Sequence, residues 1–512
     1  MMEKPYPQTT TQDLAQIRYD VEKFLLEGDF ELYENQRFIA EMKNSQAQIE
    51  LLFGKLILSS WGDGWSRSWR ILSAEISPNA LRFQCAKQLG RVECLVEMQR
   101  HHQQGEIAGT RQEFAQSIGD LIEANFPEFK VIKTITQRND PRHFSSIHTR
   151  LLIRENHQRY AAVAIGSNES SSHVDATLSA GLIWLDHLRQ TGNLINRLML
   201  LVPAGRAFTI ASRLVYVQIA GIPISLFEIG ESQRMIKPIS SFAQADLFDN
   251  LKRASQSADW SHGKPLNEGV QNFLANLQEQ TLQPIDTRRR NGWVYLAIHG
   301  LTFARIAPQK LKVEFGISLP RKKLSDKNYP ELLELIAGIS HMRTADARAF
   351  DDLRFRLQGE RWLESLLRQA VTAIDPTLDG RFVYSQVPAY RGEQRSYIDL
   401  LTATRTGRLV VIELKISEDA EFPFQGLDYW IRIDWHRRRG DFERRGYFKG
   451  LAIQDAPPLL YLVAPLFRFH ATTKLIAESI SKEVPLYRIG INENWRSGAK
   501  RLLYERLNEA PE

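Results

Sequence analysis

The chain has 512 residues and a formal net charge of +6; 43% of its residues are hydrophobic and 25% are charged. This length is too great for one hydrophobic core and predicts two to four domains, in a composition typical of a soluble globular protein. No run of eighteen apolar residues occurs, and the first residues lack the charged-then-apolar layout of a secretion signal. We therefore expect no membrane partner and a cytoplasmic location. The two cysteines, Cys85 and Cys94, are too few for a disulfide framework or a cysteine-based zinc site.

In chain order, the apolar patterns predict β-rich and α/β regions that alternate. Residues 1–105 alternate short apolar runs with turn signals and predict a β-rich domain. Residues 106–230 predict an α/β domain, and the polar, weakly patterned residues 231–287 predict a connector. Residues 288–345 predict a second β-rich segment, and residues 346–512 predict a second α/β domain. The expected fold class is therefore mixed α/β (α+β).

The two α/β regions match each other at a fixed offset of 249 residues, which pairs Phe126 with Asp375 and Gln137 with Gln386. Sequence identity between them is low, but strands, turns and helices recur in the same order. This recurrence predicts a diverged internal duplication.

Polar side chains at the ends of two strands distinguish the second copy. Asp399 closes the run SYIDL, and Glu413 and Lys415 end the next apolar run. Residues 405–408, with the sequence RTGR, supply the hairpin turn between the two strands. Since side chains alternate between the faces of a strand, Glu413 and Lys415 share one face. Adjacent strands of this kind bring both carboxylates within reach of one ion.

The first copy keeps the apolar frame without these polar groups. Opposite Asp399, Glu413 and Lys415 the alignment has Arg150, Ala164 and Gly166. If Asp399, Glu413 and Lys415 were only structural caps or surface ion pairs, the first copy would have no reason to lack all three. We therefore expect the first copy to be catalytically inactive.

Two neighbouring carboxylates suit a hard divalent cation, Mg²⁺ or Mn²⁺, which prefers oxygen ligands and retains several waters. The candidate ligands are Asp399, Glu413 and the backbone carbonyl of Leu414. Such an ion activates a water and neutralises charge on a phosphate, and Lys415 would orient that water or stabilise developing negative charge. The expected chemistry is hydrolysis of a phosphodiester bond.

Helices on either side of the hairpin add further candidates. A stripe of apolar residues from Leu363 to Ile374 predicts a helix, on which Glu360 lies about 50° from the stripe centre and Glu364 about 90°. Glu360 is therefore the preferred auxiliary carboxylate and Glu364 the alternative. In the helix after the hairpin, Gln425 and Tyr429 share a face and are expected to orient the lysine and the nucleotide.

A basic segment begins within this second helix, where Arg432 and His436 continue the face of Gln425 and Tyr429. Its members are Arg432, Arg437, Arg438, Arg439, Arg444 and Arg445, which suit a polyanion such as DNA. The alternative is a solvated charged face. Trp430 and Trp435 either stack on unpaired bases or belong to the core. His341, His436 and His470 have no partner at metal-ligand spacing and are expected to be structural.

As a set, these residues resemble the motifs of the PD-(D/E)XK nuclease superfamily, and especially its RecB-type branch. The motifs are a helix acid (Glu360 or Glu364), Asp399, Glu413-Leu414-Lys415, and Gln425 with Tyr429. Ile398 stands where the family has proline. The resemblance implies a restriction-endonuclease-like core, here duplicated with a degenerate first copy, and metal-dependent cleavage of DNA.

The wider architecture is similar to two-domain endonucleases that cut mismatched or branched DNA and work as homodimers. By this resemblance, the chain is either one subunit of a homodimer or a fused, single-chain pseudodimer. The favoured function is a DNA nuclease with one active site per chain, acting in repair or defence. The alternative is a non-catalytic nucleic-acid-binding or assembly protein that retains the fold. The sequence does not distinguish a DNA substrate from an RNA substrate, or endonucleolytic from exonucleolytic cleavage.

Overall fold

The structure is a computed structural model in which two compact units are distinguished. It describes residues 11–26, 30–34, 37–42, 47–52, 55–62, 65–77, 80–87, 92–100, 106–136, 147–230, 234–239, 266–281, 283–290, 292–307, 309, 311–317, 321–344, 359–391 and 394–509. Unit 1 comprises Met1–Gly109, Leu266–Thr287 and Gly292–Arg361, and unit 2 comprises Thr110–Pro265, Arg288–Asn291 and Trp362–Glu512. Four sheets with helices confirm the expected mixed α/β class. Among the described residues, no helix is long and apolar enough to cross a membrane.

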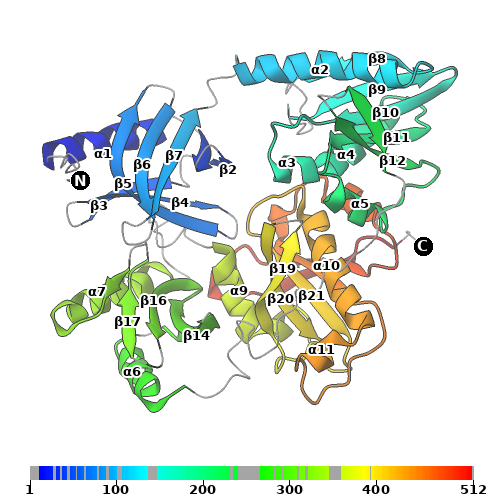
Figure 1. The fold of residues 1–512 in the computed structure, drawn as a ribbon. Helices are drawn as coiled ribbons and strands as arrows, with labels where there is room; N and C mark the ends of the chain where they lie inside the picture. Colours follow the sequence, from blue (N-terminus) through cyan, green and yellow to red (C-terminus); the bar gives the residue numbers. More distant parts are fainter. Residues whose placement is uncertain are drawn as a thin grey trace. The chain divides into compact units, whose positions relative to one another are not determined.

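Unit 1 contains a seven-stranded antiparallel sheet in the order β2-β1-β7-β6-β5-β4-β3, with helix α1 against it (Figure 1). The elements are α1 (Thr11–Leu26), β1 (Phe30–Glu34), β2 (Arg37–Met42), β3 (Ala47–Leu52), β4 (Lys55–Gly62), β5 (Trp65–Ile76), β6 (Ala80–Lys87) and β7 (Val92–Arg100). Alternate apolar residues of these strands, such as Leu56 and Leu58, are buried with Val21 and Phe24 of α1. The β-rich pattern of the sequence reflects this one-sided core.

Unit 1 also contains a five-stranded sheet in the order β14-β15-β16-β17-β18. Its elements are α6 (Glu268–Glu279), β14 (Ile285–Arg290), β15 (Trp293–Ile298), β16 (Leu301–Ala307), β17 (Lys312–Phe315), β18 (Lys322–Lys323) and α7 (Tyr329–Met342). Most of the predicted connector, including residues 240–265, lies outside the described residues.

Unit 2 consists of two α/β halves. The first half contains α2 (Glu106–Asn125), β8 (Lys130–Ile135), β9 (Thr149–Glu155), β10 (Gln158–Ala164), α3 (Ser171–Asp175), α4 (Thr177–Gln190), β11 (Arg197–Pro203), α5 (Phe208–Leu214), β12 (Ile224–Gly230) and β13 (Met235–Pro238). The second contains α9 (Gly359–Gln369), β19 (Tyr384–Arg391), β20 (Gln394–Ala403), β21 (Leu409–Leu414), α10 (Phe422–Arg438), α11 (Asp441–Arg444), β22 (Leu459–Pro465), α12 (Thr473–Glu478), β23 (Leu486–Ile491) and β24 (Arg501–Arg506). Short 3-10 helices cover Val371–Ala373, Leu466–Arg468 and Trp495–Ser497 in unit 2, and Asp326–Asn328 in unit 1.

The sheets of the two halves have the same topology. Each has six strands in which the first three in sequence pair antiparallel, the next two add in parallel, and the last is antiparallel. A glycine in each half lets a helix approach the sheet closely. A Cβ on Gly181 of α4 would lie 2.7 Å from a Leu200 methyl carbon, and one on Gly426 of α10 would lie 2.9 Å from a Leu462 methyl carbon. These contacts superpose β11 on β22, with Leu200 equivalent to Leu462.

The strand registers correct the sequence alignment by one residue. Leu200 pairs with Val163, and Leu462 pairs with Glu413, so Val163 and not Ala164 corresponds to Glu413. The same shift of one residue makes Ile165, and not Gly166, the counterpart of Lys415. The hairpin turns explain the error, because Glu155 and Gln158 are paired across a two-residue turn, whereas Ala403 and Leu409 flank five residues. Arg150 remains the counterpart of Asp399.

The two halves share one hydrophobic core. Buried residues of α4 and α5 belong to the same cluster as those of α10 and α12. Tyr216 stacks edge-on against Trp430, with ring centroids 5.2 Å apart. Backbone hydrogen bonds also join the halves, from Gln218 N to Ser479 O (2.8 Å) and from Ser481 N to Tyr216 O (2.7 Å). Helix α10 is therefore packed between its own sheet and the first half.

Candidate active site

Two antiparallel strands position the candidate acids. Leu400 of β20 pairs with Ile412 of β21, and continuing this register by one residue brings Asp399 opposite Glu413. The Leu414 backbone N–H donates to Asp399 Oδ2 at 3.0 Å. Glu413 and Lys415 are each only 5% exposed, so their charged heads lie in a largely water-excluded place.

The turn between these strands requires glycine. Gly407 has a φ of +91°, and a Cβ there would lie 1.9 Å from the Ala452 carbonyl oxygen. The predicted hairpin at 405–408 is confirmed. Because this turn fixes the register of the strands, it also fixes which residues face Asp399.

Gln386 connects Asp399 to a carboxylate on helix α9. Its Nε2 donates to Glu364 Oε2 at 2.9 Å and to Asp399 Oδ1 at 3.3 Å. Gln386 has a φ of +53°, a left-handed conformation that is rare for residues other than glycine and that clusters at functional sites. Glu364 is fully buried, and Arg288 Nη1 lies 3.1 Å from its Oε1. Asp399 therefore accepts a hydrogen bond at each carboxylate oxygen, from Gln386 at Oδ1 and from the Leu414 N–H at Oδ2.

Of the two candidate helix acids, Glu364 is joined to Asp399 through Gln386. The preference for Glu360 as the auxiliary carboxylate stays a prediction. Glu360 lies one turn earlier and is partly exposed. An apolar stripe ranks the two acids only on a helix that is buried on one face, but the consecutive residues Trp362 to Ser365 are all buried, which covers most of the circumference. The helix also ends at Gln369, before the last apolar residues that were used to place the stripe.

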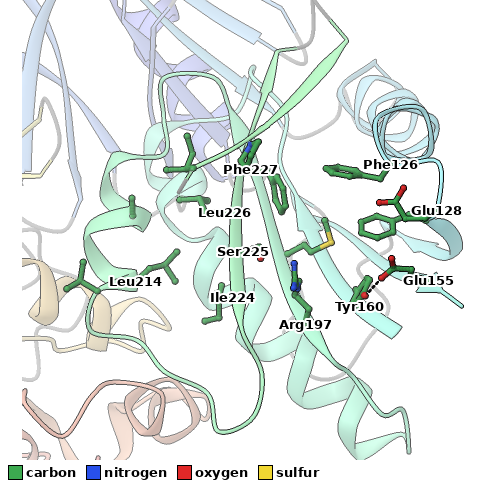
Figure 2. Close-up of a pocket in the computed structure, with 16 residues that line it drawn as sticks. Phe126, Glu128, Glu155, Tyr160, Arg197, Leu214, Ile224, Ser225, Leu226 and Phe227 are labelled. Carbon is green, nitrogen blue, oxygen red and sulfur yellow. Dashed lines mark hydrogen bonds between the residues drawn. The ribbon is translucent and has the colours of Figure 1, made fainter. Parts of the chain in front are cut away.

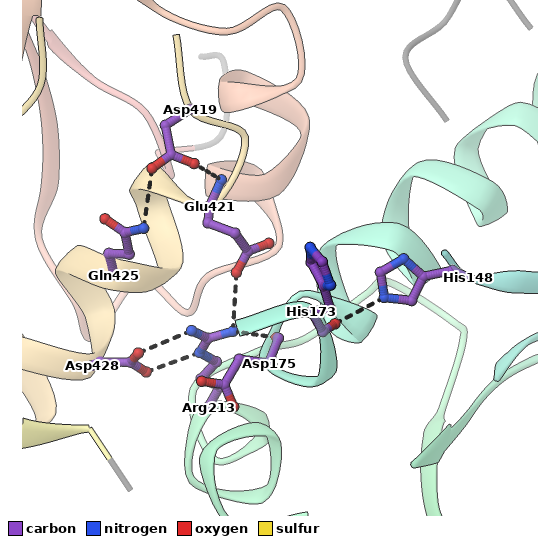
Figure 3. A network of polar contacts seen from close by, with 8 residues as sticks. All are labelled: His148, His173, Asp175, Arg213, Asp419, Glu421, Gln425 and Asp428. Atoms are coloured by element: carbon purple, nitrogen blue, oxygen red, sulfur yellow. Dashed lines mark hydrogen bonds and ion pairs between the residues drawn. The ribbon is translucent and has the colours of Figure 1, made fainter. Parts of the chain in front are cut away.

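Asp419 joins the lysine to the following helix. Lys415 Nζ lies 3.5 Å from Asp419 Oδ2, and Gln425 Nε2 donates to the same oxygen at 3.1 Å. The Glu421 backbone N–H donates to Asp419 Oδ1 at 2.8 Å, which fixes the carboxylate at the start of α10 (Figure 3). Sequence reasoning missed Asp419, although its position four residues after Lys415 in a short loop was a usable signal.

Tyr429 lies one turn after Gln425 on α10 and is 8% exposed. The next residue, Trp430, belongs to the core: it is 1% exposed, and its Nε1 donates to the Pro458 carbonyl at 2.7 Å. Trp435 is only partly buried, with the Arg439 guanidinium 4.4 Å from its ring centroid. The core alternative is therefore correct for Trp430.

Acidic residues offset much of the basic segment. Arg437 and Arg438 both contact Asp434, at 2.8 and 2.6 Å, and Arg437 also contacts Asp455. Asp441 contacts Arg439 (3.5 Å) and Arg444. Arg432 is buried, Arg445 is partly buried, and the exposed members are Arg438, Arg439 and Arg444. The surface available to a polyanion is therefore smaller than the sequence indicates.

Two of the histidines have structural hydrogen bonds. His436 is 2% exposed and its Nδ1 pairs with Asp441 Oδ2 at 2.8 Å, and His470 Nδ1 pairs with the Thr472 hydroxyl at 2.7 Å. Within the described residues, no three His, Cys, Asp or Glu side chains are grouped closely enough to hold a metal ion. Asp399 and Glu413 form a smaller set, two carboxylates on facing strands. Such a set fits a cation that keeps most of its waters.

The first half has a cavity where the second half has tyrosines. Tyr461, Tyr487 and Tyr504 pack together, with centroids 5.0 to 5.9 Å apart, and the Tyr461 hydroxyl donates to buried Asp375 at 2.6 Å. The strand registers make Met199, Ser225 and Pro238 their counterparts. All three line a cavity of about 830 Å³ in the first half, beside Tyr160 and Glu155 (Figure 2). The two halves therefore differ in more than the candidate acids.

Comparisons with known proteins are sparse. No protein-family model matches the sequence, and no curated protein is similar to it. Among solved structures, a chain of the EndoMS–dsDNA2 complex is 12% identical, and the match covers 44% of this chain and 95% of that chain, with a TM-score of 0.16. At this TM-score the likeness says nothing about the fold or activity of the present chain.

Proposed function

We propose that this protein is a divalent-metal-dependent nuclease that hydrolyses phosphodiester bonds of DNA, with one active site per chain. The observation that carries this proposal is the pair of carboxylates, Asp399 and Glu413, opposite each other on adjacent strands with Lys415 two residues further along. Glu413 is buried and Asp399 is partly buried, and neighbouring carboxylates shielded from water repel each other unless a cation or a proton lies between them. A largely buried lysine beside such a pair is suited to a phosphate.

In this proposal each residue has a separate task. Asp399, Glu413 and the Leu414 carbonyl hold Mg²⁺ or Mn²⁺, which supplies positive charge to the phosphate and makes a water more nucleophilic. Gln386 holds Asp399 in orientation through its hydrogen bond. Lys415, kept near Asp419, donates to the water or to a phosphate oxygen. Gln425 and Tyr429 on α10 orient the lysine and the nucleotide.

The proposal extends to the architecture: unit 2 is a duplicated PD-(D/E)XK core, a single-chain pseudodimer whose first copy is degenerate. Arg150, Val163 and Ile165 stand at the positions of the proposed acids and lysine, and none of them supplies a carboxylate. One working site cuts one strand per encounter. The protein should therefore nick a supercoiled plasmid rather than cut both strands at once.

The test is a supercoiled-plasmid assay with Mg²⁺ or Mn²⁺, using Asp399→Asn and Glu413→Gln against Arg150→Met as a matched control in the first half. We expect the parent and the control to accumulate nicked circles and both site variants to lose more than about 100-fold in rate, the usual loss when one preorganised catalytic group is removed. Chelation by EDTA should stop the reaction. Undiminished cutting by Asp399→Asn would show that the site is elsewhere.

A non-catalytic DNA-binding protein is the second candidate, favoured by the lack of a three-carboxylate group among the described residues. Both candidates predict binding that weakens steeply with salt, because the exposed arginines displace counterions from DNA. Calorimetry with Mn²⁺ separates them. Uptake of the ion by the parent that disappears in Glu413→Gln supports the nuclease, and no uptake by the parent supports the binding protein.

A further inference from the structure

A fully buried arginine of the first half contacts the helix that follows the candidate hairpin. Arg213 of α5 donates from Nε and Nη2 to the two carboxylate oxygens of Asp428 on α10, each at 2.9 Å (Figure 3). Its Nη1 donates to the Asp175 carbonyl at 2.7 Å and lies 3.3 Å from Glu421 Oε2. The guanidinium also lies 5.1 Å from the ring centroid of Phe424. The side chain of Arg213 is 0% exposed.

Burial of this kind makes the contact rigid. Burial alone would lower the pKa of Arg213, but Asp428 and Glu421 raise it above its ordinary range, so the guanidinium stays charged. A planar guanidinium that binds both oxygens of a carboxylate fixes direction as well as distance. Removing only one partner would leave the other charge buried and uncompensated.

The residues that Arg213 holds are adjacent to the candidate site. Asp428 immediately precedes Tyr429. Glu421 uses its backbone N–H to hold Asp419, and Asp419 contacts both Gln425 and Lys415. Arg213 therefore fixes α10 at two points, one on each side of Gln425.

The contact of Arg213 with Asp428 and Glu421, here called the clamp, has no arginine counterpart in the equivalent helix pair of the described residues. With Gly181 equivalent to Gly426, the position of Asp428 on α10 corresponds to Ile183 on α4, an apolar residue. The helix equivalent to α5 is α12, whose sequence TKLIAE contains no arginine. A contact needed only to join the halves would be expected in both directions after a duplication. This one is found only against the helix that bears Gln425 and Tyr429.

We propose that Arg213 is a positioning residue: by holding Asp428 and Glu421 it sets α10 so that Gln425 and Tyr429 face Lys415 and the scissile phosphate. This inference rests on the nuclease proposal. It makes the first half, inactive by itself, an essential part of the single site.

The experiment compares three variants of the full chain. Arg213→Lys keeps the charge and loses the two-pronged contact. The double variant Arg213→Met/Asp428→Leu removes both charges and keeps the apolar volume, so it avoids an uncompensated buried charge. Arg150→Met removes another buried arginine of the first half, from β9, and is the matched control.

The readouts are hydrogen exchange of α10 amides and the separate kcat and KM of plasmid nicking. We expect exchange across residues 422–438 to accelerate at least about tenfold in the double variant, with unchanged exchange in β9–β11, and kcat to fall at least about tenfold at constant KM. Arg213→Lys should lie between the parent and the double variant. Arg150→Met should match the parent.

The outcomes separate the two proposals. Parent-like exchange and parent-like kcat in the double variant overturn the positioning role, and if that variant does not fold, the same result in Arg213→Lys overturns it. A parent that cuts no DNA overturns the nuclease proposal. In that event hydrogen exchange alone decides whether Arg213 fixes α10, and accelerated exchange with no cutting refutes only the catalytic purpose of the clamp.

Discussion

Replacing Glu364 by glutamine changes one atom of a buried side chain and removes its charge from the proposed site. Glu364 Oε2 accepts a hydrogen bond from Gln386 at 2.9 Å, and Gln386 in turn donates to Asp399 at 3.3 Å. A hydrogen bond to a charged group contributes about 1.5–3 kcal/mol. A glutamine keeps one acceptor oxygen in place of two, so Gln386 and Arg288 compete for it and the charge-assisted hydrogen bond to Gln386 is weakened. Gln386 is then held less firmly as the donor to Asp399. At about 1.4 kcal/mol per tenfold, the expected fall in nicking rate is roughly 10- to 150-fold.

Glu360→Gln is the matched control, since Glu360 lies one turn earlier on the same helix and is partly exposed. It should keep the parent rate within about threefold, because Gln386 makes its hydrogen bonds to Glu364 and Asp399 and the substitution keeps the shape of the Glu360 side chain. The assay is Mn²⁺-dependent plasmid nicking, with thermal unfolding to confirm that both variants fold. The reasoning is refuted if Glu360→Gln abolishes cutting while Glu364→Gln cuts like the parent.

Three further predictions concern the loop, a buried histidine and the tyrosine cluster. Asp419→Asn should lower kcat about tenfold or more, measured by nicking, because Lys415 and Gln425 lose the charge they share. Burial lowers the pKa of His148 to about 4, so on acidification the unfolded chain takes up the proton before the folded chain does. About 3 kcal/mol of folding stability should therefore be lost as the pH falls from about 6.5 to 4. Urea unfolding should show a flatter pH dependence in His148→Gln. Tyr461→Met should destabilise unit 2 by about 2–4 kcal/mol in thermal unfolding, because it leaves a void and removes the donor to Asp375. Met199→Tyr should cost under about 1 kcal/mol, because the 830 Å³ cavity accommodates the ring.

Local periodicity was enough to predict the strand pair around the candidate acids. Alternation predicted that Glu413 and Lys415 share a face, and RTGR predicted the hairpin turn, because both depend only on residues near in sequence. The register that brings Asp399 opposite Glu413 came from the structure. The equivalences in the first half came out one residue wrong, because they depend on the length of its own turn. The proposed roles of these residues stay predictions.

The contacts that orient the acids could not be predicted in this way. Gln386 comes from a different strand and has a left-handed φ, which no propensity favours for glutamine. The alignment of the two α/β regions pairs Gln386 with Gln137, but this pairing alone assigns no role to either glutamine. Gln137 lies outside the described residues. Arg213 is 215 residues away from Asp428 in the chain. Only the tertiary packing of the two halves reveals that contact.

Under the proposed function, the shared core explains why a copy without the acids would be retained beside a copy that has them. Helix α10 is nearly surrounded: Gly426 lets it approach β22, and Trp430 packs against Tyr216 of the first half. An isolated second half would expose these apolar side chains and leave Asp428 without the guanidinium that compensates its charge. Loss of the acids from the first copy removes nothing that α10 needs, whereas loss of its frame removes the surface on which α10 is held. Selection for a single site would therefore preserve the apolar frame of the first copy and Arg213 while leaving the positions at Arg150, Val163 and Ile165 free to change.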